Sequence, residues 1–342
     1  MIRIIVAGAR GFFGSAVVRI LRDEGNAPLT ASRRSGGDLL LDVEDRASIR
    51  AAIRPHDVVV DATAPFHTRT TALVDEAIAI GADVVDLSDS LGYARLVWTR
   101  DDPARERGVR VLNACSSVSV LSAFAIERSE IRRPVALHGF LAPATRYTAN
   151  RGAAESLMAS VGRSIDVRRA GELHHTSGWI ETREFAALRR RGHVTEMADT
   201  FTLPRVYPSL RDVDFWVDPN ALGAGALLGL VARVPAFAPI AARLARYGAP
   251  LARLAGSGEG VLAYEVEGAA GKHATIVFTG RESFLLAVIP AALAAIRLAF
   301  GEPCPAGVVP VDQQVSKEAL AAALTRYRID QFVARPRRRS SV

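Results

Sequence analysis

Three glycines spaced three residues apart stand near the start of the chain, in a run that reads Gly8, Ala9, Arg10, Gly11, Phe12, Phe13 and Gly14. An apolar stretch, residues 2–7, precedes this run, and residues 15–21 follow with helical periodicity. A strand, a glycine turn and a helix in this order bind the diphosphate of a dinucleotide, because the glycines allow a tight turn, close backbone approach and close helix packing. An ordinary glycine-rich loop is the alternative, since the chain has 27 glycines.

The end of the second expected strand, residues 28–32, carries Ser32, Arg33 and Arg34. NAD-binding versions of this turn place Asp or Glu here to accept a hydrogen bond from the ribose 2′-hydroxyl. Guanidinium groups bind a 2′-phosphate instead, so the sequence predicts NADP(H) rather than NAD. Arginine abundance is the alternative explanation, because all but two of the 43 basic residues are arginine.

Candidate proton donors are few. The extended short-chain dehydrogenases use a Tyr with a Lys four residues later, but here Tyr147 is followed by Arg151 and Tyr207 by Arg211. That chemistry is therefore not expected. The remaining candidates are His174, His175, Tyr147 and Asp89, each of which also has an ordinary structural explanation. The sequence assigns no catalytic residue.

Cysteine usage bears on metal binding and on redox environment. Cys115 and Cys304 are the only cysteines, too few for a disulfide framework or a thiolate metal site. We expect no metal site, a reducing environment and a cytoplasmic location. The opening apolar stretch contains Arg3 and leads directly into the glycine turn, so it does not have the pattern of a signal peptide.

Length and charge give broader limits. A chain of 342 residues with 49% hydrophobic composition is long enough for two domains. The net charge of +7 reflects arginines dispersed among acidic residues, so no nucleic-acid partner is expected. The one basic run, residues 335–339, lies in a tail, residues 331–342, that we expect to be disordered; contact with a phosphate-rich partner is its alternative role.

Apolar strands alternate with helices through the first third of the chain, which predicts an α/β fold with a Rossmann-like, doubly wound parallel sheet. We assign residues 1–132 to this NADP-binding domain. Alternating strands later in the chain, at 135–141, 165–169, 260–267 and 273–278, predict a second, α+β domain over 133–282 for substrate binding or dimerisation. Residues 283–330 are expected to be helical and to pack back on the first domain.

Two uncharged apolar stretches, residues 219–232 and 283–296, are too short to span a bilayer. We interpret them as buried helices. A lipid-surface protein that uses the helices predicted in the region 221–256 is the alternative, and a homodimer is left open.

Several segments together resemble the saccharopine dehydrogenase-like (saccharopine reductase) NADP-binding family and a bacterial branch of it. They are residues 8–14, 32–34, 57–66, 76–88, 114–122 and 150–163. By this resemblance, Ala9 to Phe13 hold the pyrophosphate and Arg33 with Arg34 the 2′-phosphate. Asp42 with Val43 contacts the adenine edge, and the nicotinamide ribose is lined by Ala64, Pro65 and Phe66.

Core packing is the alternative role for Phe66. Residues 116–121 also lack the Asp and Pro that many relatives have in this stretch, which argues against saccharopine itself as the substrate. The sequence therefore predicts an NADP(H)-dependent oxidoreductase for a small molecule with a C=N, C=O or activated C=C bond. The alternative is a catalytically silent dinucleotide-binding or assembly protein.

Overall fold

The computed structural model describes residues 2–148, 160–220, 224–234, 256–269 and 271–334. The chain divides into two compact units, and neither is continuous in sequence. Unit 1 comprises Met1–Phe124, Phe201–Val206 and Leu285–Ala323, and unit 2 comprises Ala125–Thr200, Tyr207–Phe284 and Leu324–Val342. Unit 1 ends its first segment at Phe124, before the predicted limit at 132, and includes Phe201–Val206, which was not expected there; its last segment, Leu285–Ala323, lies within the residues 283–330 that were expected to pack on the first domain.

Unit 1 is built on a seven-stranded sheet in the order β15-β6-β5-β4-β1-β2-β3, and every neighbouring pair is parallel. The order reverses at β1, which lies between β2 and β4. The strands are β1 Ile4–Ala7, β2 Leu29–Ser32, β3 Leu39–Leu40, β4 Val58–Asp61, β5 Asp83–Asp86, β6 Arg110–Leu112 and β15 Gly307–Val308.

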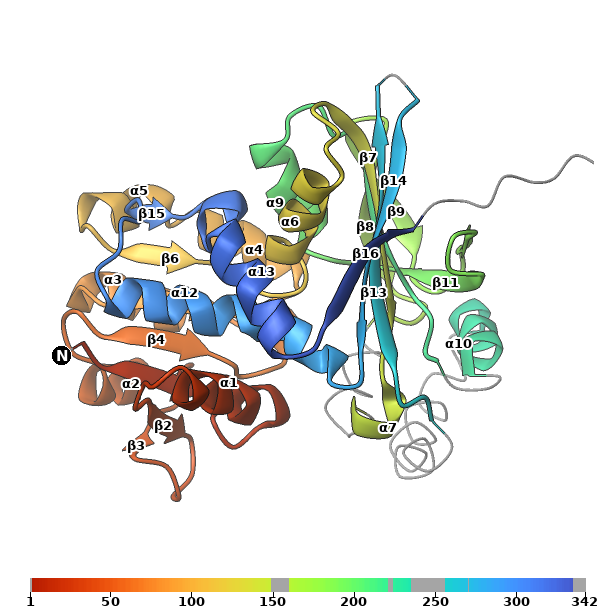
Figure 1. The fold of residues 1–342 in the computed structure, drawn as a ribbon. Helices are drawn as coiled ribbons and strands as arrows, with labels where there is room; N and C mark the ends of the chain where they lie inside the picture. Colours follow the sequence, from red (N-terminus) through yellow and green to blue (C-terminus); the bar gives the residue numbers. More distant parts are fainter. Residues whose placement is uncertain (1, 149–159, 221–223, 235–255, 270, 335–342) are drawn as a thin grey trace, which may run out of the picture. The chain divides into compact units, whose positions relative to one another are not determined.

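Helices cover both faces of this sheet (Figure 1). Strands β1, β4 and β5 are buried along their whole length, as expected for a parallel sheet covered on two sides. Gly81 ends α3 in the left-handed conformation, with φ of 88°, as its position in the sequence predicts. The helices whose residues lie in unit 1 are α1 Phe12–Asp23, α2 Arg46–Ala52, η1 Phe66–Thr68, α3 Ala72–Ile80, α4 Leu91–Trp98, α5 Asp101–Glu106, α12 Ile289–Ala299 and η4 Val311–Gln313.

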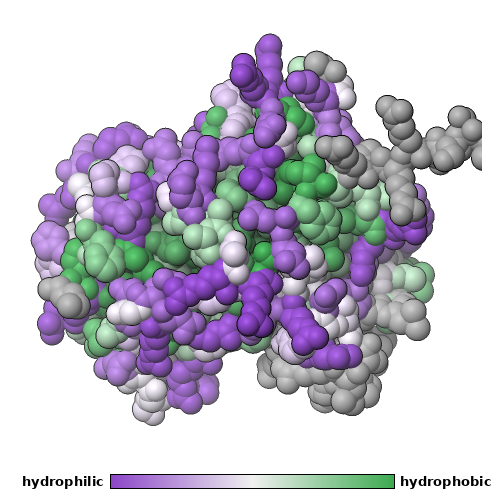
Figure 2. Space-filling model, in the orientation of Figure 1, coloured by the Kyte–Doolittle hydropathy of each residue, from purple (hydrophilic) through white to green (hydrophobic). Residues whose placement is uncertain are grey.

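Four helical segments cross the limits between the units: α6 Val120–Arg128, α9 Asp199–Val206, η3 Ser283–Ala287 and α13 Lys317–Arg326. Two further helices, α7 Thr145–Thr148 and α10 Ala224–Arg233, belong to unit 2. None of the helices in the described part of the chain has the length and apolar character that crossing a bilayer requires. Figure 2 shows hydrophilic residues interspersed with hydrophobic ones over the face that it draws.

Unit 2 contains a mixed, nine-stranded sheet with the main order β10-β11-β12-β7-β13-β14-β16; β8 pairs with β12 and β9. The predicted hairpin is confirmed, since β13 and β14 are antiparallel. The strands are β7 Pro134–Ala142, β8 Ser164–Arg169, β9 Glu172–Ser177, β10 Thr182–Phe185, β11 Arg190–Thr195, β12 Asp212–Val217, β13 Gly260–Gly268, β14 His273–Gly280 and β16 Asp330–Ala334.

The expectation of a disordered tail from residue 331 is wrong at its beginning. Residues 330–334 form β16, which pairs antiparallel with β14 through contacts that include Phe332 with Val277. Backbone hydrogen bonding to a sheet edge orders this segment despite its exposed side chains. The basic run at 335–339 lies outside the described residues, as do most of the helices predicted at 152–161 and within 221–256.

Candidate functional site

The glycine turn forms at the carboxyl end of β1, where the strand order reverses. Gly8 has φ of +75°, and a Cβ atom there would lie 2.9 Å from the carbonyl oxygen of Ala62. A Cβ on Gly14 would lie only 2.1 Å from the carbonyl oxygen of Gly8, and one on Gly11 3.2 Å from the same atom. The turn therefore has the compactness for which its glycines are required, and it lies where open α/β sheets bind ligands.

Helix α1 starts directly after this turn. Gly11 is its N-cap and makes no side-chain capping hydrogen bond, and no acidic residue lies in the first turn. The helix has 12 residues, so its amino end offers backbone N–H groups and a positive dipole end beside the turn. Ala9 is buried whereas Arg10 and Phe13 are exposed. Because these side chains differ in exposure and in chemistry, the predicted pyrophosphate contacts from Ala9 to Phe13 depend on backbone atoms.

The end of β2 gathers three arginines. Arg33 and Arg34 are exposed, and Ser32 Oγ donates to the carbonyl oxygen of Arg34 over 2.5 Å. Arg10 reaches the same loop from the glycine turn, because its Nη1 donates to the carbonyl oxygen of Ser35 over 2.8 Å. The sequence analysis assigned Arg10 to the pyrophosphate. Its hydrogen bond to Ser35, 25 residues further along the chain, could not be predicted from the local spacing of residues.

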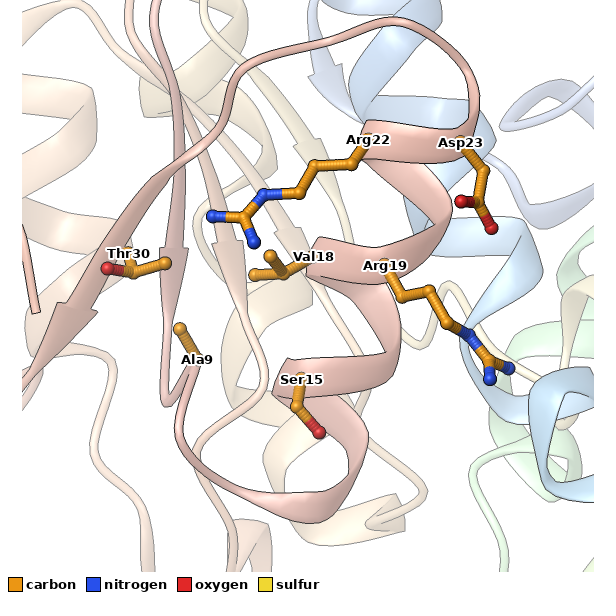
Figure 3. Close-up of a pocket in the computed structure, with 7 residues that line it drawn as sticks. All are labelled: Ala9, Ser15, Val18, Arg19, Arg22, Asp23 and Thr30. Atoms are coloured by element: carbon orange, nitrogen blue, oxygen red, sulfur yellow. The ribbon is translucent and has the colours of Figure 1, made fainter.

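A cavity of about 390 Å³ opens beside this region. Figure 3 shows Arg22 extending across it toward Thr30 of β2, while Arg19 points away. Thr30 is held by Asp38, whose carboxylate accepts from the Thr30 backbone N–H over 2.8 Å and from its hydroxyl over 2.7 Å. These hydrogen bonds, the backbone one first, lower the pKa of Asp38. The lining residues are Ala9, Ser15, Val18, Arg19, Arg22, Asp23 and Thr30.

The two residues expected at the adenine edge follow β3. The Asp42 carboxylate accepts from the backbone N–H of Glu44 over 3.1 Å, which closes a local turn. Val43 is 4% exposed and belongs to the hydrophobic core of unit 1. The side chain of Val43 therefore packs inward, and only its backbone remains for a ligand.

The three residues predicted to line the nicotinamide ribose lie in the loop after β4 and differ in exposure. Ala64 and Pro65, joined by a cis peptide bond, are exposed. Phe66 is buried in the hydrophobic core, with its ring 5.4 Å from that of Tyr93. Of the two roles considered for Phe66, the structure shows core packing.

This loop is fixed by Arg69, which the sequence analysis did not single out. The Arg69 side chain is 6% exposed, and Nη2 lies 2.8 Å from the fully buried carboxylate of Asp61. Nη1 donates to the Thr63 carbonyl oxygen over 3.0 Å, and Nε donates to Glu44. Burial lowers the pKa of Arg69, but the Asp61 charge and the hydrogen bonds outweigh it and raise that pKa. Arg69 therefore ties the loop after β4 to the one after β3.

Asp86, at the end of β5, is a second residue that the sequence analysis missed. Its side chain is fully buried and accepts from Asn113 Nδ2 over 2.8 Å and from the backbone N–H groups of Ala114 at 2.9 Å and Ser88 at 3.0 Å. Burial outweighs these hydrogen bonds and raises the pKa of Asp86 to about 6. Asp86 therefore connects the loops that follow β5 and β6.

Asp89 and His67 are titratable side chains in the loops that follow β5 and β4. Both are exposed to solvent. Although the residue as a whole is exposed, the protein around the Asp89 carboxyl desolvates it and raises its pKa; a hydrogen bond from its own backbone and, after that, the nearby charge of His67 oppose this effect. Asp89 thus retains a proton more readily than an ordinary surface carboxyl.

The other sequence candidates lie in unit 2. His174 and His175 are exposed on β9, and His175 Nδ1 lies 2.5 Å from Asp166 Oδ1 on the adjacent β8. Tyr147 is 40% exposed on α7. Within the described residues, no group of three or more His, Cys, Asp or Glu side chains is arranged to hold a metal ion.

Comparison with known proteins identifies the fold. The family model for the NAD dependent epimerase/dehydratase family matches residues 4–170, a stretch that begins in β1 and contains the glycine turn. A search of the curated proteins gives no match. Among solved structures, saccharopine dehydrogenase (L-Glu forming) from Saccharomyces cerevisiae matches with a TM-score of 0.63 and 14% identity, over 98% of this chain and 100% of that chain. The chain has a saccharopine dehydrogenase-like fold.

The saccharopine dehydrogenase-like fold confirms the predicted class, a Rossmann-like sheet with a second α+β domain, and the resemblance inferred from the sequence segments. A further solved structure is the WlbA dehydrogenase from Thermus thermophilus, determined with NAD and alpha-ketoglutarate. It matches with a TM-score of 0.41 and 12% identity, over 95% of this chain and 96% of that chain. That score is too low to support any inference.

Proposed function

We propose that this protein is an NADP(H)-dependent oxidoreductase that acts on a small molecule with a C=N, C=O or activated C=C bond. The observation that carries the proposal is the approach of Gly14 to Gly8, which leaves no space for a Cβ and sets the start of α1 against the end of β1. Such a cradle suits a diphosphate. The fold shared with a saccharopine dehydrogenase, and the matching family model for NAD dependent enzymes, support the same function.

Specificity for NADP(H) is supported by the arginines at the end of β2. Arg33 and Arg34 are exposed there, and Arg10 is anchored on the same loop through Ser35. A guanidinium binds a phosphate in bidentate fashion, whereas a carboxylate at this place would repel it. Asp38, the nearest acidic residue along the loop, is engaged by Thr30.

The reactive end of the cofactor would lie over the carboxyl ends of β4 and β5. A bound nicotinamide supplies the hydride chemistry, and the protein orients the reactants and excludes water. Ala64 and Pro65 offer an exposed surface whose backbone is held by Arg69 through Thr63. Asp89 is the best candidate there to hold a proton for the substrate, because crowding raises its pKa.

Binding of NADPH and NADH to the full chain, measured by calorimetry, tests this function. Arg33→Ala with Arg34→Ala should weaken NADPH binding by at least about tenfold and leave NADH binding nearly unchanged, since each charged hydrogen bond contributes roughly 1.5 to 3 kcal/mol. The matched control is Arg132→Ala with Arg133→Ala, a second pair of adjacent exposed arginines, in unit 2. Failure of the wild-type protein to bind either dinucleotide would refute the proposal.

The alternative is a catalytically silent dinucleotide-binding protein. It is favoured by one feature of the sequence, the lack of a lysine four residues after Tyr147 or Tyr207. The two functions differ in turnover: an oxidoreductase oxidises NADPH in the presence of some member of a panel of imines, ketones and activated alkenes. Tight NADPH binding without oxidation across the whole panel would favour the silent protein.

A further inference from the structure

Residues 33–38, which we call the arginine loop because they include Arg33 and Arg34, join two strands that are parallel neighbours. The pairing of β2 with β3 begins with Ala31 opposite Leu39. A connection between parallel neighbours ordinarily takes about a dozen residues or more, because the chain must return to the start of the second strand. The arginine loop makes this return in a much shorter stretch, between the end of β2 and the start of β3.

The arginine loop returns in close contact with β2 and with the glycine turn. A Cβ on Gly37 would lie 2.9 Å from the carbonyl oxygen of Thr30, a backbone atom of β2. Gly36 has φ of +110°, and a Cβ there would lie 2.7 Å from Arg10 Nη1. The same Nη1 atom donates to the carbonyl oxygen of Ser35. The arginine loop is therefore folded back on β2 and does not extend freely into solvent.

Asp38, the last residue of the arginine loop, attaches the loop to Thr30. Asp38 Oδ2 accepts from the Thr30 backbone N–H over 2.8 Å and from the Thr30 hydroxyl over 2.7 Å. The backbone N–H of Asp38 in turn donates to Thr30 Oγ1 over 3.2 Å. One residue pair thus holds the returning end of the loop against the middle of β2 through both backbone and side-chain atoms.

The Asp38 carboxylate has two opposite effects on a phosphate bound by Arg33 and Arg34. Its negative charge repels the phosphate, although the solvent and a nearby cation weaken this repulsion. The cation is Arg22, which extends toward Thr30 (Figure 3); after the hydrogen bonds from Thr30, its charge also lowers the pKa of Asp38. The hydrogen bonds to Thr30 favour binding, because a loop that is already ordered loses less conformational entropy when it binds a ligand.

We propose that Asp38 is a positioning residue for the 2′-phosphate of NADP(H): through Thr30 it fixes the arginine loop and thereby increases the preference for NADPH over NADH. This inference rests on the proposed function. The ordering effect of Asp38 exceeds the repulsion by its charge. Asp38 thus differs in role from the carboxylate that NAD-binding turns place at the end of the second strand, which accepts a hydrogen bond from the ribose.

Two substitutions of Asp38 in the full chain separate its hydrogen bonds from its charge. Both hydrogen bonds from Thr30 go to one oxygen atom, Oδ2, so Asp38→Asn keeps an acceptor and loses the charge, whereas Asp38→Ala loses both. In calorimetry, Asp38→Ala should bind NADPH about threefold to tenfold more weakly than wild type, and NADH within about twofold of it, as for the loss of an ordinary hydrogen bond. Asp38→Asn should bind NADPH more tightly than Asp38→Ala does. Asp102→Ala, which removes an exposed carboxylate elsewhere in unit 1, is the control and should change neither affinity.

The direction of the change decides between the two effects. If Asp38 acted through its charge alone, Asp38→Ala and Asp38→Asn would both bind NADPH more tightly than wild type. NADPH binding by Asp38→Ala that equals or exceeds that of a wild type able to bind NADPH would overturn the positioning role and leave the proposed function intact. Equal weakening of NADPH and NADH would likewise overturn it. Absence of NADPH binding by the wild type would overturn the proposed function and this role together.

Trypsin cleavage tests the attachment of the arginine loop without any cofactor. Arg33 and Arg34 are exposed, but cleavage beside them requires the loop to open locally. Asp38→Ala, and Thr30→Val, which removes the hydroxyl, should each speed this cleavage by about threefold or more, as for the loss of a hydrogen bond. Cleavage after Arg132, an exposed arginine of unit 2, should keep its rate. An unchanged rate after Arg33 and Arg34 in Asp38→Ala would show that Asp38 does not hold the loop.

Discussion

Gly14 lies against the carbonyl oxygen of Gly8, so closely that a Cβ on Gly14 would be 2.1 Å from that oxygen. The contact joins the first turn of α1 to the end of β1. The atoms that a Cβ on Gly14 would meet belong to the backbone and cannot rotate away, so this position requires glycine. The dinucleotide cradle therefore depends on the absence of a side chain at Gly14.

Gly14→Ala should both destabilise the protein and abolish NADPH binding. Forcing a methyl group into a packed site costs about 1 to 3 kcal/mol, and the backbone shift that relieves it displaces the start of α1. Urea unfolding and NADPH calorimetry measure the two effects. Gly92→Ala is the control, since its Cβ would meet nothing closer than Ser90 Oγ at 3.9 Å, and it should change neither by much. Normal NADPH binding by Gly14→Ala would show that the turn does not hold the cofactor.

Arg10→Gln should reduce the preference for NADPH over NADH. Arg10 holds the loop after β2 through Ser35, so its loss removes a cation and frees the loop that carries Arg33 and Arg34. We expect NADPH to bind about tenfold more weakly and NADH to bind within about twofold of wild type, as for the loss of one charged hydrogen bond. Competition calorimetry with both dinucleotides measures the ratio. An exposed arginine of the same unit, Arg54, provides the control as Arg54→Gln. Equal weakening of both dinucleotides would place Arg10 at the shared diphosphate instead.

Asp86 should contribute a distinctive pH dependence of stability. Its folded-state pKa of about 6 is higher than the ordinary value of 3.8, so the folded protein binds this proton more tightly than the unfolded chain does. The associated stabilisation is complete below about pH 4 and is lost as pH rises through 6, by about 3 kcal/mol in all.

Asp86→Asn tests this pH dependence because it removes the titrating group while keeping its size. Urea unfolding from pH 4 to pH 7 gives the unfolding free energies of wild type and Asp86→Asn. As pH rises, the unfolding free energy of the wild type should fall relative to that of the variant. Asp102→Asn provides the control, since Asp102 is 84% exposed and pairs with Arg105 at 3.0 Å. A difference that stays constant with pH would mean that Asp86 does not titrate in this range.

The parallel sheet of unit 1 was predictable from sequence because its strands are apolar throughout, as in Val58, Val59 and Val60, and are separated by helices with clear end signals. In unit 2, β9 was not predicted, since Glu172–Ser177 presents mostly exposed polar side chains without the alternation of a half-buried strand. Its pairing with β8, not its own pattern, orders it.

The sequence did not reveal side-chain pairs whose residues are far apart along the chain. His138 and Asp214 are 76 positions apart and meet only because β7 and β12 are neighbours in register. The turn of Gly8 and Gly14, by contrast, is local, and local spacing is what a single sequence displays. This difference explains why the cofactor turn was found and the pair of His138 and Asp214 was not.

Arg69→Met should destabilise unit 1 by about 3 to 5 kcal/mol, because it leaves the fully buried carboxylate of Asp61 without its partner at 2.8 Å. It should also release the loop of Ala64 and Pro65, which lowers activity with NADPH more than it lowers NADPH affinity. Urea unfolding gives the first effect, and calorimetry with steady-state rates the second. Arg105→Met is the control: Arg105 is 58% exposed, so loss of its ion pairs should cost less than about 1 kcal/mol. Equal destabilisation by the two variants would show that the Arg69–Asp61 pair has no special role in holding this loop.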